Sequence, residues 1–111
     1  MCGIVALFGE EVDVSSYLLS HRGPDDYRSM TLGKCRMDFY RLAINDLTDA
    51  GMQPFSNGKE MLICNGEIYN HREFRKGDEM STSDCEVLLP LIKDYGMMKT
   101  LELINGDFAF I

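Results

Sequence analysis

The residue with the clearest chemical potential is Cys2, which follows Met1 directly and opens the apolar run 3–9. If Met1 is removed, Cys2 becomes the N-terminus and carries both a thiol and a free α-amino group. A thiolate is a strong nucleophile, and an α-amino group with a pKa of roughly 7.7–8.0 accepts a proton near neutral pH. One residue then serves as nucleophile and base, and no catalytic histidine is required. The alternative is that Cys2 is a small buried residue on a first strand.

Composition limits the classes of protein to consider. A chain of 111 residues that is 45% hydrophobic predicts one globular domain, because this length is sufficient to bury a core. The 18 acidic and 11 basic residues give a net charge of −7, which disfavours nucleic acid and anionic membranes as partners. No basic segment precedes the opening apolar run, and Glu10 and Glu11 follow it. We therefore expect neither a signal peptide nor a membrane span, and a cytoplasmic location.

The remaining cysteines predict neither a metal site nor a redox pair. The four cysteines have no C-x-x-C spacing, which is typical of zinc sites and of redox motifs. In a reducing compartment we expect Cys35, Cys64 and Cys85 to be reduced and mostly buried thiols.

Five strands are expected from hydrophobic pattern and turn signals, at residues 2–8, 30–32, 36–44, 60–65 and 107–111. Arg41 lies towards the end of the third. An Asn-Gly turn at 57–58 introduces the fourth, and this hairpin places Asn65 and Gly66 at a strand end. The polar Gly-Pro segment His21–Asp25 predicts a structured turn.

Helices are expected at residues 14–20, 72–74, 83–95 and 98–104. The third begins with a capping box, in which Ser83 caps the helix and Glu86 lies three residues later. Asp84 then falls in the first turn. Pro90 lies inside the same helix and predicts a kink or a local loss of regularity.

Five segments occur in this order along the chain: Met1–Ile4, His21–Asp25, Arg41–Ile44, Asn65–Asn70 and Ser83–Glu86. Together they resemble the class II glutamine amidotransferase domain, and most closely the glutaminase domain of asparagine synthetases. Members of the class that feed ammonia to sugar phosphates or to phosphoribosyl pyrophosphate fit less well. The resemblance implies an α+β N-terminal nucleophile hydrolase fold, an αββα sandwich of two antiparallel sheets between helical layers.

The resemblance also implies a reaction. Cys2 would attack the side-chain amide of L-glutamine and form a thioester, with ammonia leaving and water completing the hydrolysis to glutamate. The tetrahedral intermediate carries an oxyanion, for which the side-chain amide of Asn65 and the backbone N–H of Gly66 are suitable donors. The implied catalytic residues are therefore Cys2, Asn65 and Gly66.

Three further residues are implied to bind the substrate. Arg41 offers a planar fork for the α-carboxylate of glutamine, and Asp84 can accept hydrogen bonds from its α-ammonium group, with Glu67 contributing. Each has a plainer alternative: Arg41 as a solvated residue at a strand end, and Asp84 as a favourable charge near a helix dipole. His21 is interpreted as a residue that orders its loop, and it stays outside the predicted site.

The sequence differs from the family pattern in ways that concern how much of the domain it contains. The family's domain continues past a Gly-x-Phe-Ala-Phe segment such as Gly106–Phe110, and the segments 9–21 and 70–83 are short. We therefore expect residues 1–111 to be the N-terminal portion of the domain, with an incomplete sandwich. An open sheet edge at 107–111 is expected to pair with another chain or to aggregate.

The sequence contains no Ser-Gly-Gly-x-Asp-Ser nucleotide loop, so we expect no synthetase domain and no cofactor here. L-glutamine is the expected ligand, and an ATP-dependent synthetase domain or subunit is the expected partner. Two alternatives remain open. In the first, the chain is a non-catalytic remnant that binds glutamine or a partner. In the second, it is a fragment of a longer asparagine synthetase-like enzyme.

Overall fold

The first sheet has three antiparallel strands in the order β1-β3-β2. In this computed structural model, which describes residues 1–9 and 18–111, the strands are β1 (Gly3–Phe8), β2 (Asp26–Leu32) and β3 (Cys35–Arg41). All three predicted strands in this region are confirmed, although β2 starts earlier and β3 ends at Arg41. Residues 42–43 leave the sheet because their N–H groups bond to side chains outside it. The helix predicted at 14–20 falls mostly on residues 10–17, outside the described residues.

Two short antiparallel pairs follow. They are β4 (Phe55–Ser56) with β5 (Met61–Leu62), and β6 (Cys64–Ile68) with β7 (Gly106–Phe110). The single strand predicted at 60–65 is therefore wrong, because it is divided at Ile63. The N–H and carbonyl of Ile63 exchange hydrogen bonds of 3.1 and 3.0 Å with Ile111, so the chain changes partner at this residue. As a result, Asn65 and Gly66 lie inside β6 and not at a strand end.

Within residues 1–9 and 18–111, the helical segments are three short 3-10 helices and two α-helices: η1 (Asp49–Gly51), η2 (His71–Phe74), η3 (Asp84–Val87), α1 (Leu88–Tyr95) and α2 (Met97–Leu103). The predictions at 72–74 and 98–104 are confirmed. The helix predicted at 83–95 consists of η3 and α1, and Pro90 lies in the first turn of α1. A first-turn proline loses no helical hydrogen bond, so the irregularity falls at the η3–α1 junction.

The predicted capping box is wrong. Ser83 makes no side-chain cap, and the Glu86 carboxylate turns away from it. It accepts hydrogen bonds from the N–H groups of Met80 and Ser81, at 2.7 and 2.9 Å, and from the Ser81 hydroxyl. Glu86 therefore ties residues 80–81 to the start of the helix instead of closing the cap.

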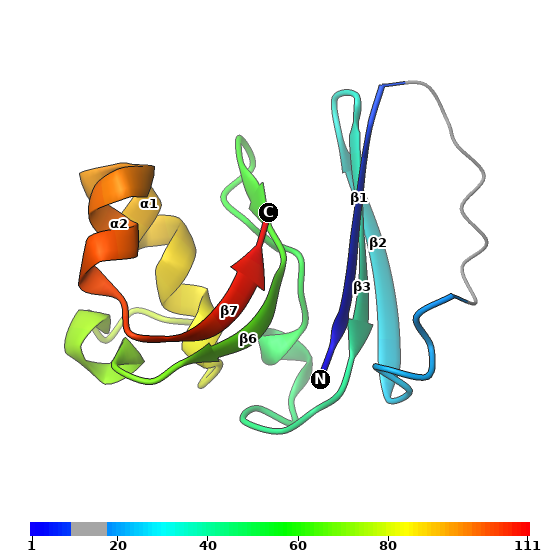
Figure 1. The fold of residues 1–111 in the computed structure, drawn as a ribbon, viewed down its shortest axis with the longest axis horizontal. Coiled ribbons are helices and arrows are strands. Elements are labelled where there is room, and N and C mark those ends of the chain that lie inside the picture. Colours follow the sequence, from blue (N-terminus) through cyan, green and yellow to red (C-terminus); the bar gives the residue numbers. More distant parts are fainter. Residues whose placement is uncertain (10–17) are drawn as a thin grey trace.

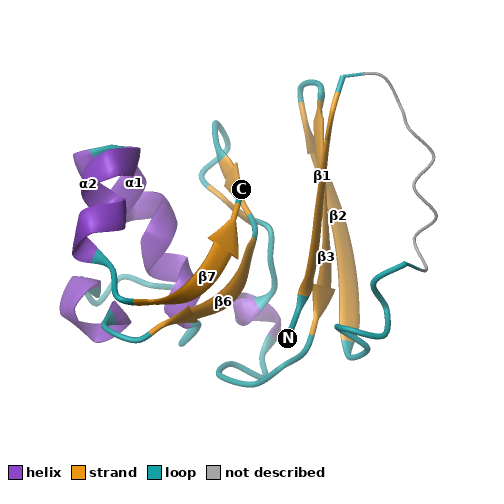
Figure 2. Cartoon of the chain, viewed as in Figure 1, coloured by secondary structure: helices purple, strands orange, loops and turns teal. Residues whose placement is uncertain are grey.

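The elements form three layers, as Figure 1 shows. Helices α1 and α2 cover one side of the β6–β7 pair, and the three-stranded sheet lies on the other side. The secondary-structure colouring in Figure 2 makes the same order visible. One core cluster, around Ile68, Val87 and Leu88, joins β6 to the helices, and a second, around Phe39 and Ile63, joins the sheet to the central layer. The α+β class and the antiparallel sheets are confirmed.

Candidate active site

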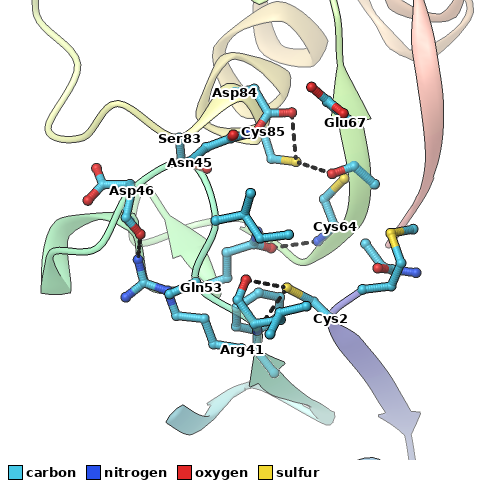
Figure 3. Close-up of a pocket in the computed structure, with 18 of the residues that line it drawn as sticks. Cys2, Arg41, Asn45, Asp46, Gln53, Cys64, Glu67, Ser83, Asp84 and Cys85 are labelled. Atoms are coloured by element: carbon cyan, nitrogen blue, oxygen red, sulfur yellow. Dashed lines mark hydrogen bonds between the residues drawn. The ribbon is translucent and has the colours of Figure 1, made fainter. Parts of the chain in front are cut away.

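A pocket of about 300 Å³ lies where the N-terminus, the end of β3, the strand β6 and the start of η3 meet. All six predicted site residues line it: Cys2, Arg41, Asn65, Gly66, Glu67 and Asp84. Its volume is at the lower end of the range for small-molecule sites. Figure 3 shows Asp84 and Glu67 on one side of the pocket, with Cys2 and Arg41 on the other.

The thiol of Cys2 is fixed by the first residue after β3. The Leu42 N–H donates to Cys2 Sγ at 3.3 Å, and Cys2 Sγ lies 3.5 Å from the Leu42 carbonyl oxygen. The side chain is half-buried, and its neighbour Gly3 begins the β1–β3 ladder opposite Tyr40. The sulfur atom is therefore held at the pocket wall by a rigid strand.

The segment His21–Asp25 braces this wall from outside. Arg22 Nε donates to the Cys2 carbonyl at 3.2 Å, and Asp25 accepts a 2.8 Å hydrogen bond from the N–H of Ala43. A Cβ at Gly23 would lie 2.1 Å from the Tyr40 carbonyl oxygen, so only glycine allows this packing. The prediction of a structured turn is confirmed, and the residues that carry the contacts are Arg22, Gly23 and Asp25.

The other thiols are not equivalent to Cys2. Cys64 and Cys85 line the pocket but are only 1% and 3% exposed, and Cys35 is half-buried in the sheet core. Two causes raise the pKa of the Cys85 thiol well above its ordinary value. The larger is its hydrogen bond with Cys64, and the second is its burial. Cys85 therefore stays protonated and is a poor nucleophile. All four cysteines are free thiols, as predicted for positions 35, 64 and 85.

Arg41 is buried, with 6% exposure, so the alternative of a solvated strand-end residue is wrong. Its guanidinium donates to the carbonyl oxygens of Asp46 and, at 2.8 Å, of Thr48. These two bonds hold the loop 42–48 against the pocket. Because guanidinium has five N–H donors, others remain for a bound carboxylate.

Replacing Arg41 with lysine tests the carboxylate site. We expect Arg41→Lys to raise the KM for glutamine far more than it lowers turnover, since the fork contacts a group that does not react. Some loss of stability is also expected, because lysine cannot make both loop bonds. Steady-state kinetics on the folded variant measures the effect, and Arg28→Lys, on β2 and outside the pocket, is the matched control. Unchanged constants for Arg41→Lys would remove Arg41 from the carboxylate site.

Asn65 and Gly66 enter the pocket from the interior of β6. Gly66 has φ +152°, and a Cβ there would lie 2.2 Å from the Asp107 carbonyl oxygen of β7, so glycine is required by the strand pairing itself. Asn65 Oδ1 is buried and has no hydrogen-bond partner among the described residues. A buried, unpaired polar atom in a pocket wall is costly, and a ligand that pairs with it recovers that cost.

Asp84 is 4% exposed and lies at the first position of η3. One carboxylate oxygen accepts a 2.6 Å bond from the Ile68 N–H, and the other accepts a 2.9 Å bond from Asn45 Nδ2. These partners hold the charge at a fixed place in the pocket. Glu67 is exposed and projects beside it from β6.

Residues that the sequence analysis did not single out hold the pocket together. Asp46 accepts hydrogen bonds of 2.7 Å from the N–H groups of Thr48 and Thr82, and it also accepts one from the Thr48 hydroxyl. These bonds, the one from the hydroxyl most of all, lower the pKa of Asp46. Gln53 Oε1 accepts the Cys64 N–H at 2.6 Å. The contact between Asp46 and Thr82 joins residues 36 positions apart, so local patterns give no signal for it.

Two further features of the described residues concern metal ions and membranes. No group of three or more histidine, cysteine, aspartate or glutamate side chains in this part of the chain is placed to hold a metal ion. In the same residues, no helix has the length and apolar character needed to cross a membrane.

The fold and the pocket define an α+β protein in which Cys2 and the buried Arg41 lie on one side of a small cavity and the buried Asp84 lies on the other. The whole chain, residues 1–111, matches the glutamine amidotransferase domain, and it belongs to this family.

Three similar proteins are named as glutamine-hydrolysing asparagine synthetases. The probable glutamine-hydrolysing asparagine synthetase of Acanthamoeba polyphaga mimivirus is 38% identical over 127 residues, which cover 100% of this chain and 23% of the relative. The asparagine synthetase of Rattus norvegicus is 39% identical over 125 residues, with 100% and 22% covered. That of Sandersonia aurantiaca is 38% identical over 126 residues, with 100% and 24% covered. The chain thus spans about a quarter of the length of these relatives.

Proposed function

We propose that this chain hydrolyses L-glutamine to glutamate and ammonia, with Cys2 as an N-terminal nucleophile. The observation that carries the proposal is the convergence of all six predicted residues on one pocket from four separate segments. Membership of the glutamine amidotransferase family supports the same reaction class.

In the proposed mechanism, Met1 has been removed and the α-amine of Cys2 takes the thiol proton. The sulfur attacks the side-chain carbonyl carbon of glutamine, and the carbonyl oxygen becomes an oxyanion that Asn65 Nδ2 and the Gly66 N–H stabilise. Collapse expels ammonia, which takes the proton from the ammonium group, and leaves a thioester. The amine then deprotonates a water molecule that attacks the thioester, and glutamate leaves as the sulfur regains a proton.

Substrate recognition is assigned to the opposite charges of the pocket. Arg41 binds the α-carboxylate through its remaining donors, and Asp84 binds the α-ammonium group, with Glu67 adding negative charge at the rim. Because one fixed cation and one fixed anion lie in the same cavity, the site favours an amino acid amide over a simple amide.

The larger assembly is part of the proposal. We assign residues 1–111 to the N-terminal portion of a type 2 domain with the αββα sandwich of N-terminal nucleophile hydrolases. The relatives are named as glutamine-hydrolysing asparagine synthetases, so we assign the ammonia to an asparagine synthetase-type reaction on an ATP-dependent domain or subunit. No cofactor is assigned to this domain, and the cytoplasm is its proposed location.

Removal of Met1 is the first expectation of this mechanism. Met1 is 58% exposed, and the small side chain after it suits removal of the initiator. We expect intact-mass measurement of active protein to show loss of Met1. A chain kept blocked by an uncleaved N-terminal tag is expected to lose about 10²–10⁴ in turnover, because the general base is lost. Full retention of Met1 in an active preparation would contradict the N-terminal-base mechanism.

Labelling with a glutamine-like electrophile tests the function as a whole. We expect the wild-type protein to gain one covalent adduct at Cys2, and Cys35→Ser, which changes a thiol outside the pocket, to gain the same adduct. Cys2→Ser is expected to stay unlabelled. If folded wild-type protein without Met1 does not react, the non-catalytic binding remnant replaces the enzyme as the better account.

A further inference from the structure

Asn45 is a pocket residue that the proposed mechanism does not use. It lies in the loop after β3, and its side-chain Nδ2 donates to Asp84 Oδ1 at 2.9 Å. This bond fixes the orientation of the amide, because the nitrogen faces the carboxylate. The Asn45 Oδ1 atom makes no hydrogen bond to the residues that the structure describes, so it is an unused acceptor beside Asp84.

The backbone around Asn45 is held on both sides, so this acceptor is preorganised. The Arg41 guanidinium bonds to the carbonyl oxygens of Asp46 and Thr48, which fixes the loop from within. The Thr82 hydroxyl donates to the Asn45 carbonyl at 3.3 Å, and Asp46 Oδ2 accepts the Thr82 N–H at 2.7 Å. The loop and the segment before η3 therefore form one unit that holds the Asn45 backbone, and the exposed Asn45 side chain is oriented by its hydrogen bond to Asp84.

The free acceptor matches one group of the substrate. An ammonium group carries three N–H donors and no acceptor. Asp84 Oδ1 accepts one hydrogen bond, from Asn45 Nδ2, and so retains a lone pair, whereas Oδ2 accepts from both the Ile68 N–H and, at 3.8 Å, the Cys85 thiol. A ligand ammonium beside Asp84 thus meets carboxylate oxygens and, next to them, the amide oxygen of Asn45.

We infer that Asn45 determines specificity for the α-amino group of the substrate: its Nδ2 orients Asp84, and its Oδ1 accepts one N–H of the α-ammonium. This inference rests on the proposed function, since it takes glutamine as the ligand. It goes further because it assigns recognition of the amino group to a neutral side chain as well as to the carboxylate. Removal of the Asn45 side-chain amide is then expected to lower the affinity for ligands that carry an α-amino group and to leave the affinity for ligands without one unchanged.

The test compares two ligands on one variant. L-glutamine and 4-carbamoylbutanoate share the side-chain amide and the carboxylate, and only the first has an α-amino group. Binding is measured in a Cys2→Ala background, which prevents turnover, by titration to tens of millimolar. Asn45→Leu keeps the approximate size of the side chain. We expect it to weaken the binding of L-glutamine by about tenfold or more. Binding of 4-carbamoylbutanoate is expected to change by less than about twofold, since no ammonium contact is lost.

Control variants distinguish recognition of the α-amino group by Asn45 from a purely structural role of Asn45 in the pocket wall. Asn57→Leu makes the same change at an exposed turn outside the pocket and is expected to leave both affinities unchanged. If Asn45→Leu does not fold, Asn45→Ala takes its place. Equal weakening of both ligands would mean that Asn45 only supports the pocket wall, and no weakening would remove it from the site. Either result overturns the inference while leaving glutamine binding by the parent intact. Failure of the folded Cys2→Ala parent to bind L-glutamine would instead overturn the proposed function.

Discussion

Replacing Cys2 with alanine is expected to lower the turnover of glutamine by at least about 10⁴. In the proposed mechanism Cys2 forms the covalent intermediate, and a catalytic set that loses its nucleophile retains only binding and oxyanion stabilisation. Steady-state ammonia release measures the loss. Glutamine affinity, measured by titration, is expected to change only a few-fold, because Cys2 contacts the reacting amide and not the charged groups that select the amino acid.

Matched cysteine variants make this result specific. Cys35→Ala changes a half-buried thiol outside the pocket and is expected to keep wild-type turnover per folded molecule. Cys85→Ala changes a pocket thiol that the raised pKa keeps protonated. It is expected to lower stability, as buried large-to-small changes do, while leaving labelling at Cys2 intact. If Cys85→Ala abolished labelling and Cys2→Ala did not, the nucleophile would have been assigned to the wrong residue.

The sequence predicted the six proposed site residues but not the contacts that hold them. Cys2, Arg41 and Asp84 belong to short motifs whose residue types suit glutamine chemistry. The hydrogen bond from Asn45 to Asp84 joins residues 39 positions apart, and that from Thr82 to Asp46 spans 36. Such pairs depend on how the loop after β3 meets the segment before η3. No local period or turn signal encodes that meeting.

The errors in secondary structure arise from hydrogen bonds that the sequence pattern does not show. Local pattern correctly predicted the strands β1, β2 and β3 and the helix α2, because the hydrophobic pattern of a strand and the spacing of a helix are both local. It missed the break at Ile63, which arises from pairing with Ile111, 48 residues away in the sequence. It also misplaced Glu86, whose carboxylate is taken by residues 80–81 instead of the expected cap. A long-range strand pairing caused the first error, and hydrogen bonds to residues five and six positions earlier caused the second.

The second large effect is expected at Asn65. If its side-chain amide donates to the developing oxyanion, Asn65→Ala lowers the acylation rate by about 10²–10³, or roughly 2.7–4 kcal/mol, with only a small change in glutamine affinity. The structure supports this role because Asn65 lines the pocket, and its Oδ1 atom has no hydrogen-bond partner among the described residues that would fix the amide elsewhere. Rates of covalent labelling by a glutamine-like electrophile, normalised to folded protein, measure the change.

A purely structural Asn65 predicts the opposite balance. Substitution of a structural strand residue lowers stability by about 1 kcal/mol and leaves the rate per folded molecule nearly intact. The unpaired Oδ1 strengthens the contrast, because removing a buried atom without a partner removes a desolvation cost. Asn65→Ala is therefore expected to be close to neutral in thermal denaturation while losing most of its acylation rate. A destabilised variant with an unchanged labelling rate would assign the oxyanion to the Gly66 N–H alone.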